Sequence, residues 1–261
     1  MKITYFGYNS FVIEEADISI AIDPGASFYI PDFFKTIIPI DRWHALTHIL
    51  VTHGDPDHYW HTDRVAKASG AFIVCNDTII KGDQMIGPRK KDVGLVKKLE
   101  NTVGISVGES KEVGTLKIQG IKTVHGPLNI KIGPFKKTVR PGPDERIGYG
   151  AIGFQFELHG LSFVNLGDTL LMKDDWIDIK KPDVLMIPIG GESAGNTMTT
   201  EEALIAVQSI EPGLVIPCHY NCGGFFSKCY NPVDGDLFKT KVEEMGFKCS
   251  ILKPGEQLIL K

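Results

Sequence analysis

One short polar stretch carries the residues of this sequence that are best suited to bind metal ions. The run His53-Gly54-Asp55-Pro56-Asp57-His58 places two imidazoles and two carboxylates within six residues. Imidazole nitrogen and carboxylate oxygen are ligands that zinc, iron and manganese accept. The run starts where the nearly all-apolar segment 47–53 ends, and that segment is typical of a strand buried on both faces. Residues that leave such a strand enter a loop, where ligands can converge.

Three further potential ligands stand at the ends of β-like runs. His125 ends "IQGIKTVH", Asp168 ends "SFVNLGD" and His219 ends "LVIPCH". Any one of them alone would more often be a loop residue or a buried histidine with ordinary hydrogen bonds. Four β-like runs that all end on ligand-type residues in one chain favour a shared metal site instead.

The surrounding pattern predicts strands that carry helices on their outer side, which is a layered α/β sandwich. Residues 3–23 contain three β-like runs. Further strands are predicted within 47–53, 71–76, 110–126, 151–169, 183–191 and 214–221, and at the C-terminal end, and helices at 61–69, 90–101, 200–211 and 236–246. A capping box at Thr199 opens the third helix. The two halves echo each other, since each begins with hairpin-like strands and ends with alternating strands and helices. Segments 26–45 and 129–146 are predicted to be irregular.

Composition narrows the class of protein. The 261 residues are 43% hydrophobic and 23% charged, as in ordinary globular proteins, and the net charge of −4 gives no reason to expect nucleic acid. No apolar run approaches the ~18 residues that cross a bilayer, and the N-terminus lacks a signal-peptide pattern. Five scattered cysteines favour a reducing, cytoplasmic setting. We therefore expect a small-molecule substrate, no nucleic-acid or membrane partner, and a homo-oligomer as an open alternative.

The order of the potential ligands resembles the metallo-β-lactamase superfamily, whose motif H-x-H-x-D-H follows a strand and precedes a distant His, Asp and His. The matching residues are His53, Asp57, His58, His125, Asp168 and His219, and Asp23 in "IAIDPG" matches the structural aspartate before the motif. Segments 153–169 and 188–221 look like the branch of ascorbate-6-phosphate-lactonase-like hydrolases. The resemblance covers essentially the whole chain. It implies a single domain over residues 1–261 with a four-layer αβ/βα sandwich.

The same resemblance implies an enzyme, a metal-dependent hydrolase with two divalent metal ions. His53, Asp55 and His125 would hold one ion, Asp57, His58 and His219 the other, and Asp168 would bridge them. Two such ions lower the pKa of a bridging water, and the resulting hydroxide attacks a small ester, lactone or phosphodiester. Asp57 and Asp168 are the expected catalytic residues.

Asp55 departs from the family pattern, which has a histidine there. Aspartate is a harder, negative ligand, so it predicts a shift from zinc toward iron or manganese. Asp55 could instead only hydrogen-bond to the ligands, which would weaken the first site. The flavodiiron branch carries a glutamate at this position, so a di-iron redox protein is an alternative. An RNA-processing nuclease and a non-catalytic binding module are the others.

Contacts to the substrate are less well defined by the sequence. Tyr220 and Asn221 follow His219, where they either donate to a developing oxyanion or only shape the turn. Segment 129–146 is basic and either binds a phosphate or carboxylate, with Arg140 suited to bidentate contact, or is a solvated charge run. Its basic residues are Lys131, Lys136, Lys137, Arg140 and Arg146.

The other histidines and the cysteines fit no motif. His61 is expected on the exposed face of the helix after the motif, with a supporting contact to the metal ligands as the alternative. His44, His48 and His159 are expected to be structural or on the surface. A separate zinc site at Cys218, Cys222 and Cys229 is disfavoured because no C-x-x-C pair occurs. The neighbouring aromatic residues, Phe225 and Phe226, are predicted either to line an apolar pocket or to pack against a partner subunit.

Overall fold

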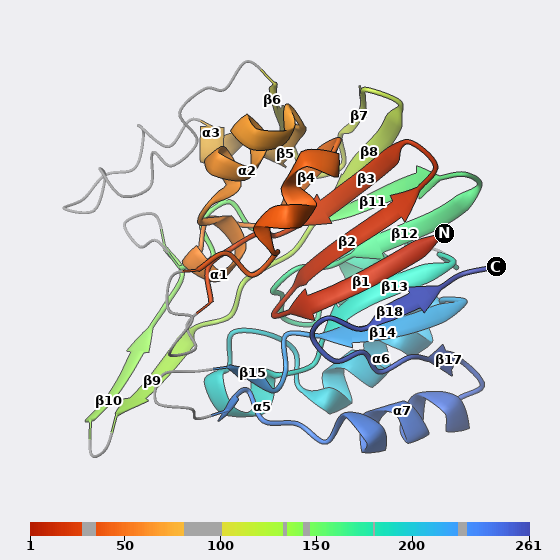
Figure 1. The fold of residues 1–261 in the computed structure, drawn as a ribbon. Coiled ribbons are helices and arrows are strands. Elements are labelled where there is room, and N and C mark those ends of the chain that lie inside the picture. Colours follow the sequence, from red (N-terminus) through yellow and green to blue (C-terminus); the bar gives the residue numbers. More distant parts are fainter. Residues whose placement is uncertain (28–34, 81–100, 133–134, 143–146, 180, 224–228) are drawn as a thin grey trace.

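Two stacked sheets form the centre of the computed structural model, which describes residues 1–27, 35–80, 101–132, 135–142, 147–179, 181–223 and 229–261 (Figure 1). The first sheet has the order β18 (Gln257–Ile259), β1 (Lys2–Gly7), β2 (Ser10–Glu15), β3 (Ile18–Ile22), β4 (His48–Val51), β5 (Phe72–Asn76), β6 (Thr102–Ile105). The second has the order β17 (Lys248–Cys249), β14 (Leu214–Cys218), β13 (Val184–Pro188), β12 (Leu161–Asn165), β11 (Gly153–Leu158), β8 (Leu116–Ile121), β7 (Ser110–Val113).

The two sheets repeat one plan. In the first, β1, β2 and β3 pair antiparallel and β3 to β6 pair parallel. In the second, β7, β8, β11 and β12 pair antiparallel and β12, β13, β14 and β17 pair parallel. This confirms the predicted echo of the two halves. Loops that leave the carboxyl ends of the parallel strands can therefore meet from both sheets.

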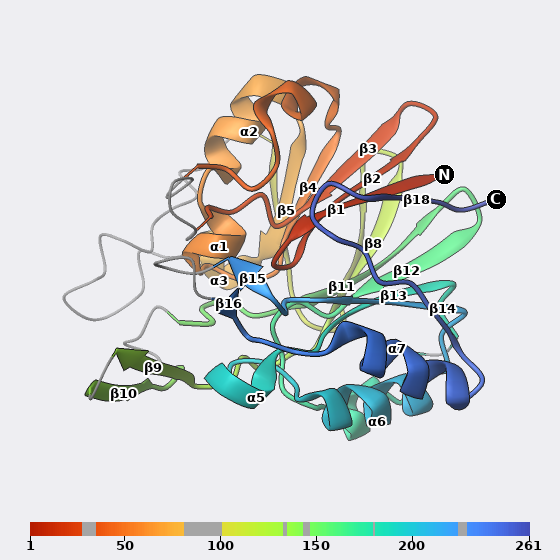
Figure 2. The same cartoon turned by 60° about the horizontal axis from the view of Figure 1, so that its bottom comes forward.

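Helices cover the outer faces of both sheets (Figure 2). The 3₁₀ helix η1 (Ile40–Ala45) and α2 (Thr62–Ser69) lie on the first sheet, and α6 (Thr200–Ile210) and α7 (Gly235–Glu244) lie on the second. The result is the predicted four-layer αβ/βα sandwich. The predicted capping box is present, because Thr199 accepts the Glu202 amide while Glu202 accepts the amide of Thr199.

Apolar burial holds the four layers together. One cluster fills the space between the sheets and includes Phe11, Ile20, Phe154, Phe156 and Phe163. Two further clusters lie between each sheet and its helices. Burying one such side chain contributes about 1.5–3 kcal/mol, so this three-part core gives the loops at the sheet ends a rigid support.

Several local predictions differ from the structure. Segment 129–146 was expected to be irregular, but β9 (Leu128–Ile132) and β10 (Phe135–Val139) pair antiparallel and extend away from the sandwich as an arm (Figure 1). The segment 26–45 contains the helix η1 and an isolated bridge between Ala26 and Thr36. The predicted helix at 90–101 lies outside the described residues, except Asn101.

Several short elements join these layers in the part of the chain that the structure describes. They are α1 (Pro56–Tyr59), α3 (Asp77–Ile80), the 3₁₀ helix η3 (Lys173–Trp176), α5 (Gly191–Ala194), β15 (Cys222–Gly223) and β16 (Cys229–Tyr230). Within the described residues, the helices are all too short or too polar to cross a bilayer.

Candidate metal centre

Loops from both sheets carry the seven predicted ligands to one place. His53 follows β4 by two residues, and Asp55 is the N-cap of α1, whose single turn presents Asp57 and His58. From the second sheet, His219 directly follows β14. The sequence predicted that His125 and Asp168 also end strands, but β8 ends four residues before His125 and β12 ends three residues before Asp168.

One group of ligand atoms comprises Asp57, His58 and His219, which lie within 4.8 Å of one another. Oδ2 of Asp57 lies 3.4 Å from Nε2 of His58 and 3.5 Å from Nε2 of His219. Two imidazole nitrogens and a carboxylate oxygen at this separation match the ligand types that a transition-metal ion takes.

A second group comprises His53, His125 and Asp168, again within 4.8 Å. Asp55 faces the same group, since its Oδ2 lies 3.4 Å from Nε2 of His53 and 3.5 Å from Nε2 of His125. The same oxygen accepts a hydrogen bond from the amide of Gly148 at 3.1 Å. The carboxylate is thus held against the two imidazoles by the backbone of a distant loop.

Asp168 stands between the two groups. Its Oδ1 lies 3.6 Å from Nε2 of His58, while its Oδ2 lies 3.0 Å from Nε2 of His219 and 3.7 Å from Nε2 of His125. A carboxylate that faces imidazoles of both groups has the position that a bridging ligand requires.

The type and the burial of the donor atoms in this cluster suit metal ions. Nε2 of three histidines and Oδ1 of two aspartates are buried and make no hydrogen bond within the described part of the chain; these residues are His53, His58, His219, Asp55 and Asp168. Leaving buried polar atoms unsatisfied costs about 1–3 kcal/mol each. Four of these atoms belong to residues of the two ligand groups and the fifth to Asp55 beside them, which indicates a ligand that satisfies them together.

The pKa shifts within the cluster also favour a bound cation. Burial alone would raise the pKa of Asp57, but His58 and His219 hold that pKa well below its ordinary value. Burial alone would lower the pKa of His58, but Asp168, Asp57 and Asp23 raise it well above its ordinary value. The buried Asp57 carboxylate therefore favours positive charge beside it, which a divalent ion supplies when it displaces protons from imidazoles.

A buried polar network supports the ligands from behind. Oδ2 of Asp23 accepts hydrogen bonds from Nδ1 of His58, Oγ1 of Thr52 and Nδ2 of Asn9, at 2.6–2.7 Å. Asn9 also exchanges two hydrogen bonds of 3.0 Å with Asn165 from the second sheet. The network thus joins both sheets immediately behind the cluster.

Sequence reasoning missed several residues that contact the ligands or the Asp23 network behind them. Asn9 and Asn165 were not predicted, nor were Asn196, whose Nδ2 donates to Oδ2 of Asp168 at 3.1 Å, and Asn231, whose side-chain amide lies 3.2 Å from Nδ1 of His219. Asparagines are common in loops, so their residue type carried no signal. Only the folded chain brings them beside the ligands.

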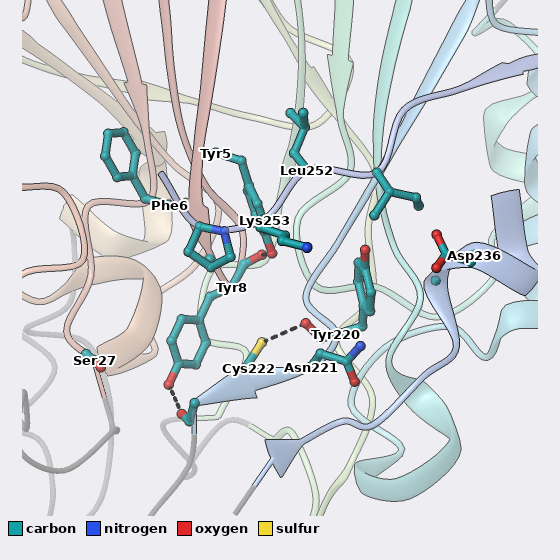
Figure 3. Close-up of a pocket in the computed structure, with 15 residues that line it drawn as sticks. Tyr5, Phe6, Tyr8, Ser27, Tyr220, Asn221, Cys222, Asp236, Leu252 and Lys253 are labelled. Carbon is teal, nitrogen blue, oxygen red and sulfur yellow. Dashed lines mark hydrogen bonds between the residues drawn. The ribbon is translucent and has the colours of Figure 1, made fainter. Parts of the chain in front are cut away.

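Tyr220 and Asn221 lie at the edge of a pocket beyond β14 (Figure 3). They line a cavity of about 430 Å³ together with Tyr8, Leu252 and Lys253, and no predicted ligand is among its described lining residues. Asn221 also donates from Nδ2 to the Val233 carbonyl at 2.8 Å and accepts from the Val233 amide, so it shapes the turn after β14. Tyr220 packs beside Gly235 at the start of α7.

The remaining candidates lie in varied surroundings. Arg140 is exposed just after β10, and Lys136 and Lys137 are exposed on β10. The structure does not describe Arg146, the side chain of Lys131, Phe225 or Phe226.

His61 is predicted on an exposed helical face, but it is the half-buried N-cap of α2 with a φ of 76°. A positive φ is compatible with a cap and not with the helix itself.

The cysteine sulfurs contact separate oxygen acceptors. Sγ of Cys218 contacts Oδ1 of Asn9 at 3.3 Å, and Sγ of Cys229 contacts Oδ1 of Asn221 at 3.4 Å. Within the described residues, neither metal-type group includes a cysteine.

Comparison with known proteins gives relatives along the whole chain. Residues 2–219 match the family described as the beta-lactamase superfamily domain. A metal-dependent hydrolase of Desulforamulus reducens is 30% identical over 261 residues, which cover 99% of this chain and 99% of that protein.

Solved structures share the fold. Igni18, a metallo hydrolase from the archaeon Ignicoccus hospitalis, superposes with a TM-score of 0.68 at 24% identity, over 100% of this chain and 99% of that one. CmlA, a diiron β-hydroxylase from Streptomyces venezuelae, gives a TM-score of 0.69 at 15% identity, over 99% of this chain and 54% of that one. Such distant likeness establishes the architecture, and the chemistry must be argued from the site.

Proposed function

This chain belongs to the beta-lactamase superfamily, and we propose that it is a hydrolase that uses two divalent metal ions to cleave a small ester, lactone or phosphodiester. The observation that carries the proposal is a set of five buried ligand atoms that make no hydrogen bond within the described residues; they belong to His53, His58, His219, Asp55 and Asp168. The metal-dependent hydrolase of D. reducens, similar over nearly its whole length, supports the same reaction class.

Each residue of the cluster has a role in this proposal. His53, Asp55 and His125 would hold one ion, and Asp57, His58 and His219 the other, with Asp168 shared. Two ions so held would make a water molecule acidic enough to supply hydroxide near neutral pH and would stabilise negative charge on a substrate oxygen.

The residues of the chain itself fix which imidazole nitrogens carry a proton, and they supply negative charge to the site. Asp23 accepts Nδ1–H of His58, and the Gly126 carbonyl accepts Nδ1–H of His125 at 2.6 Å. Both bonds leave Nε2 of the ring with a lone pair that faces the cluster. Asp57 and Asp168, the proposed catalytic carboxylates, supply the negative charge that holds the ions in a buried site.

In this proposal, Asp55 determines which metal the first site prefers. Its Oδ2 stands where it faces both His53 and His125, so the first site would contain two carboxylates and two imidazoles. Oxygen-rich sites favour iron or manganese over zinc more than all-histidine sites do. We therefore propose iron or manganese in the first site, with zinc as the alternative.

The test combines metal content and turnover. Protein purified without chelator or affinity metal should contain about two metal equivalents per chain by elemental mass spectrometry, and it should hydrolyse at least one of a p-nitrophenyl ester, a lactone and a bis-p-nitrophenyl phosphodiester. The double variant Asp57→Ala, Asp168→Ala should lose both metal and turnover. Asp183→Ala is the control, because this exposed carboxylate accepts hydrogen bonds from Ser162 and belongs to neither ligand group. Full activity in the double variant would contradict the proposal.

A small-molecule substrate is part of the proposal. The net charge of −4 does not attract polyanions to the protein as a whole. The basic residues Lys136 and Lys137 lie on β10, and Arg140 follows directly after it. Binding to single-stranded RNA that is tight and falls steeply with salt would favour the nuclease alternative instead.

A further inference from the structure

Asn196 is the buried side chain that contacts the shared carboxylate most directly without being a candidate ligand itself. Its Nδ2 donates to Oδ2 of Asp168 at 3.1 Å, and the residue is only 4% exposed. Asp168 Oδ2 is the same atom that faces His219 and His125. The amide therefore acts on the one carboxylate that lies between the two ligand groups.

The backbone of Asn196 is tied to a second ligand loop. Its carbonyl accepts the Gly126 amide at 2.9 Å, directly after His125. The contact is tight, because a Cβ on Gly126 would lie 2.2 Å from the Gly195 carbonyl oxygen. Asn196 is thus fixed relative to His125 and holds Asp168 from that position.

The carbonyl end of the amide differs from the donating end. Oδ1 of Asn196 is buried and makes no hydrogen bond within the described residues. A buried, unpartnered carbonyl costs free energy, so stability of the fold alone gives no reason for an amide here. The reason must lie in what the amide donates to, which is the carboxylate.

We infer that Asn196 is a positioning residue that sets the rotation of Asp168, so that this carboxylate can serve both metal sites at once. The inference rests on the proposed two-metal function. A neutral donor on Oδ2 fixes the plane of the carboxylate, keeps Oδ1 free toward His58, and does not compete with the ions for charge. Partners of this kind typically change metal affinity 10–100-fold when they are removed.

Two variants test the inference by metal binding, without any need for turnover. Asn196→Ala removes the donor, and Asn196→Asp replaces the donor with an acceptor while keeping size and shape. In titrations of chelator-treated protein with Co²⁺, followed by visible absorption, both should bind about 10–100-fold more weakly than wild type at one or both sites, with altered spectra. Asn101→Ala is the matched control, since it removes a single Asn side-chain hydrogen bond to the Gly70 carbonyl outside the cluster.

The outcomes separate this inference from the proposed function. Wild-type affinity and spectra in both Asn196 variants would overturn the role of Asn196 and leave the two-metal proposal intact. If the wild-type protein binds one metal equivalent, the two-metal proposal is overturned. The role of Asn196 is then decided by whether its variants weaken that single site, because Asp168 can contribute to either site.

A double-mutant cycle excludes a general structural effect. If Asn196 acts through Asp168, Asn196→Asp should cause no further loss of Co²⁺ affinity in an Asp168→Ala background. Additive losses would overturn the inference. Asn196→Asp, which preserves packing volume, also covers the case in which the alanine variant fails to fold.

Discussion

Oδ2 of Asp23 lies 2.7 Å from Nδ1 of His58, and both side chains are fully buried. A carboxylate can only accept this bond, so Nδ1 carries the proton and Nε2 is left for a metal ion. The two residues are 35 positions apart in the chain, and Asp23 also accepts the Thr52 amide just before His53. One carboxylate thus orients a ligand and pins the end of the strand from which the motif departs.

The variant Asp23→Asn should lower metal affinity about 10–100-fold at the site that contains His58. The amide is close in shape to the carboxylate, but it carries no charge to favour the protonated Nδ1, and its NH₂ group cannot accept the three donors that converge on Oδ2. Competition with a metal chelator, followed by elemental analysis, measures the change.

Asp183→Asn is the control for that experiment. This exposed aspartate also accepts a backbone amide and a hydroxyl, both from Ser162. It should leave metal affinity unchanged. Equal effects of the two variants would mean that Asp23 has no specific role toward His58.

Gly148→Ala should remove the first metal while the second stays bound. An added Cβ would lie 2.3 Å from Cβ of His125, and Gly148 also has a φ of +65° and donates its amide to Asp55. The substitution therefore acts directly on His125 and on the hydrogen bond to Asp55, whereas the nearest contacts of the added Cβ include none of Asp57, His58 and His219. Metal content measured by elemental mass spectrometry should fall from about two equivalents to about one.

Gly70→Ala separates steric displacement from backbone strain. Gly70 has a φ of +75°, but a Cβ there would meet no atom within 4 Å. This variant should lose stability by about 1 kcal/mol and keep its full metal content. Loss of metal in both variants would argue that general destabilisation, rather than the contact with His125, is responsible.

Asp55→His should shift metal preference toward zinc. The substitution exchanges a hard oxygen ligand for an imidazole at the position that faces His53 and His125. Protein loaded from an equimolar mixture of zinc and manganese should retain a larger zinc fraction than wild type. An unchanged ratio would place Asp55 outside the ligand set.

The sequence singled out the residues that the structure brings together in two metal-type groups, because ligand-type residues can be recognised from local residue types. The strands before them alternate or are wholly apolar, and Asp55 to His58 need only one helical turn to converge. The arm of β9 and β10 was missed because Gly133, Pro134 and several lysines resemble a loop in a single sequence. Cross-strand pairing such as Lys136 with Lys131 becomes visible only in the folded chain.

Long-range support could not be predicted from local pattern. Asn9 and Asn165 are 156 positions apart, yet they exchange two hydrogen bonds behind the cluster. Asn196 lies 28 positions from Asp168. Nothing in the residue types distinguishes these asparagines from those in ordinary turns, because their role depends on contacts between segments far apart in the sequence.

His48 should make the metal-free protein less stable as the pH falls. Its Nε2 donates to the Val113 carbonyl across the two sheets at 2.9 Å, and burial lowers the pKa of the imidazole below its ordinary value. Above about pH 6.5 both the folded and unfolded states hold a neutral ring, so this group costs nothing there. Below that pH the unfolded chain takes up a proton that folded His48 resists, and stability falls.

The variant His48→Asn should be less stable by about 1 kcal/mol at pH 8, because the bond to Val113 is weakened, but it should lose less stability than wild type between pH 8 and pH 5. Urea unfolding in the presence of a chelator measures both slopes, and since all other groups are common to the two proteins, equal slopes would show that His48 titrates alike in both states.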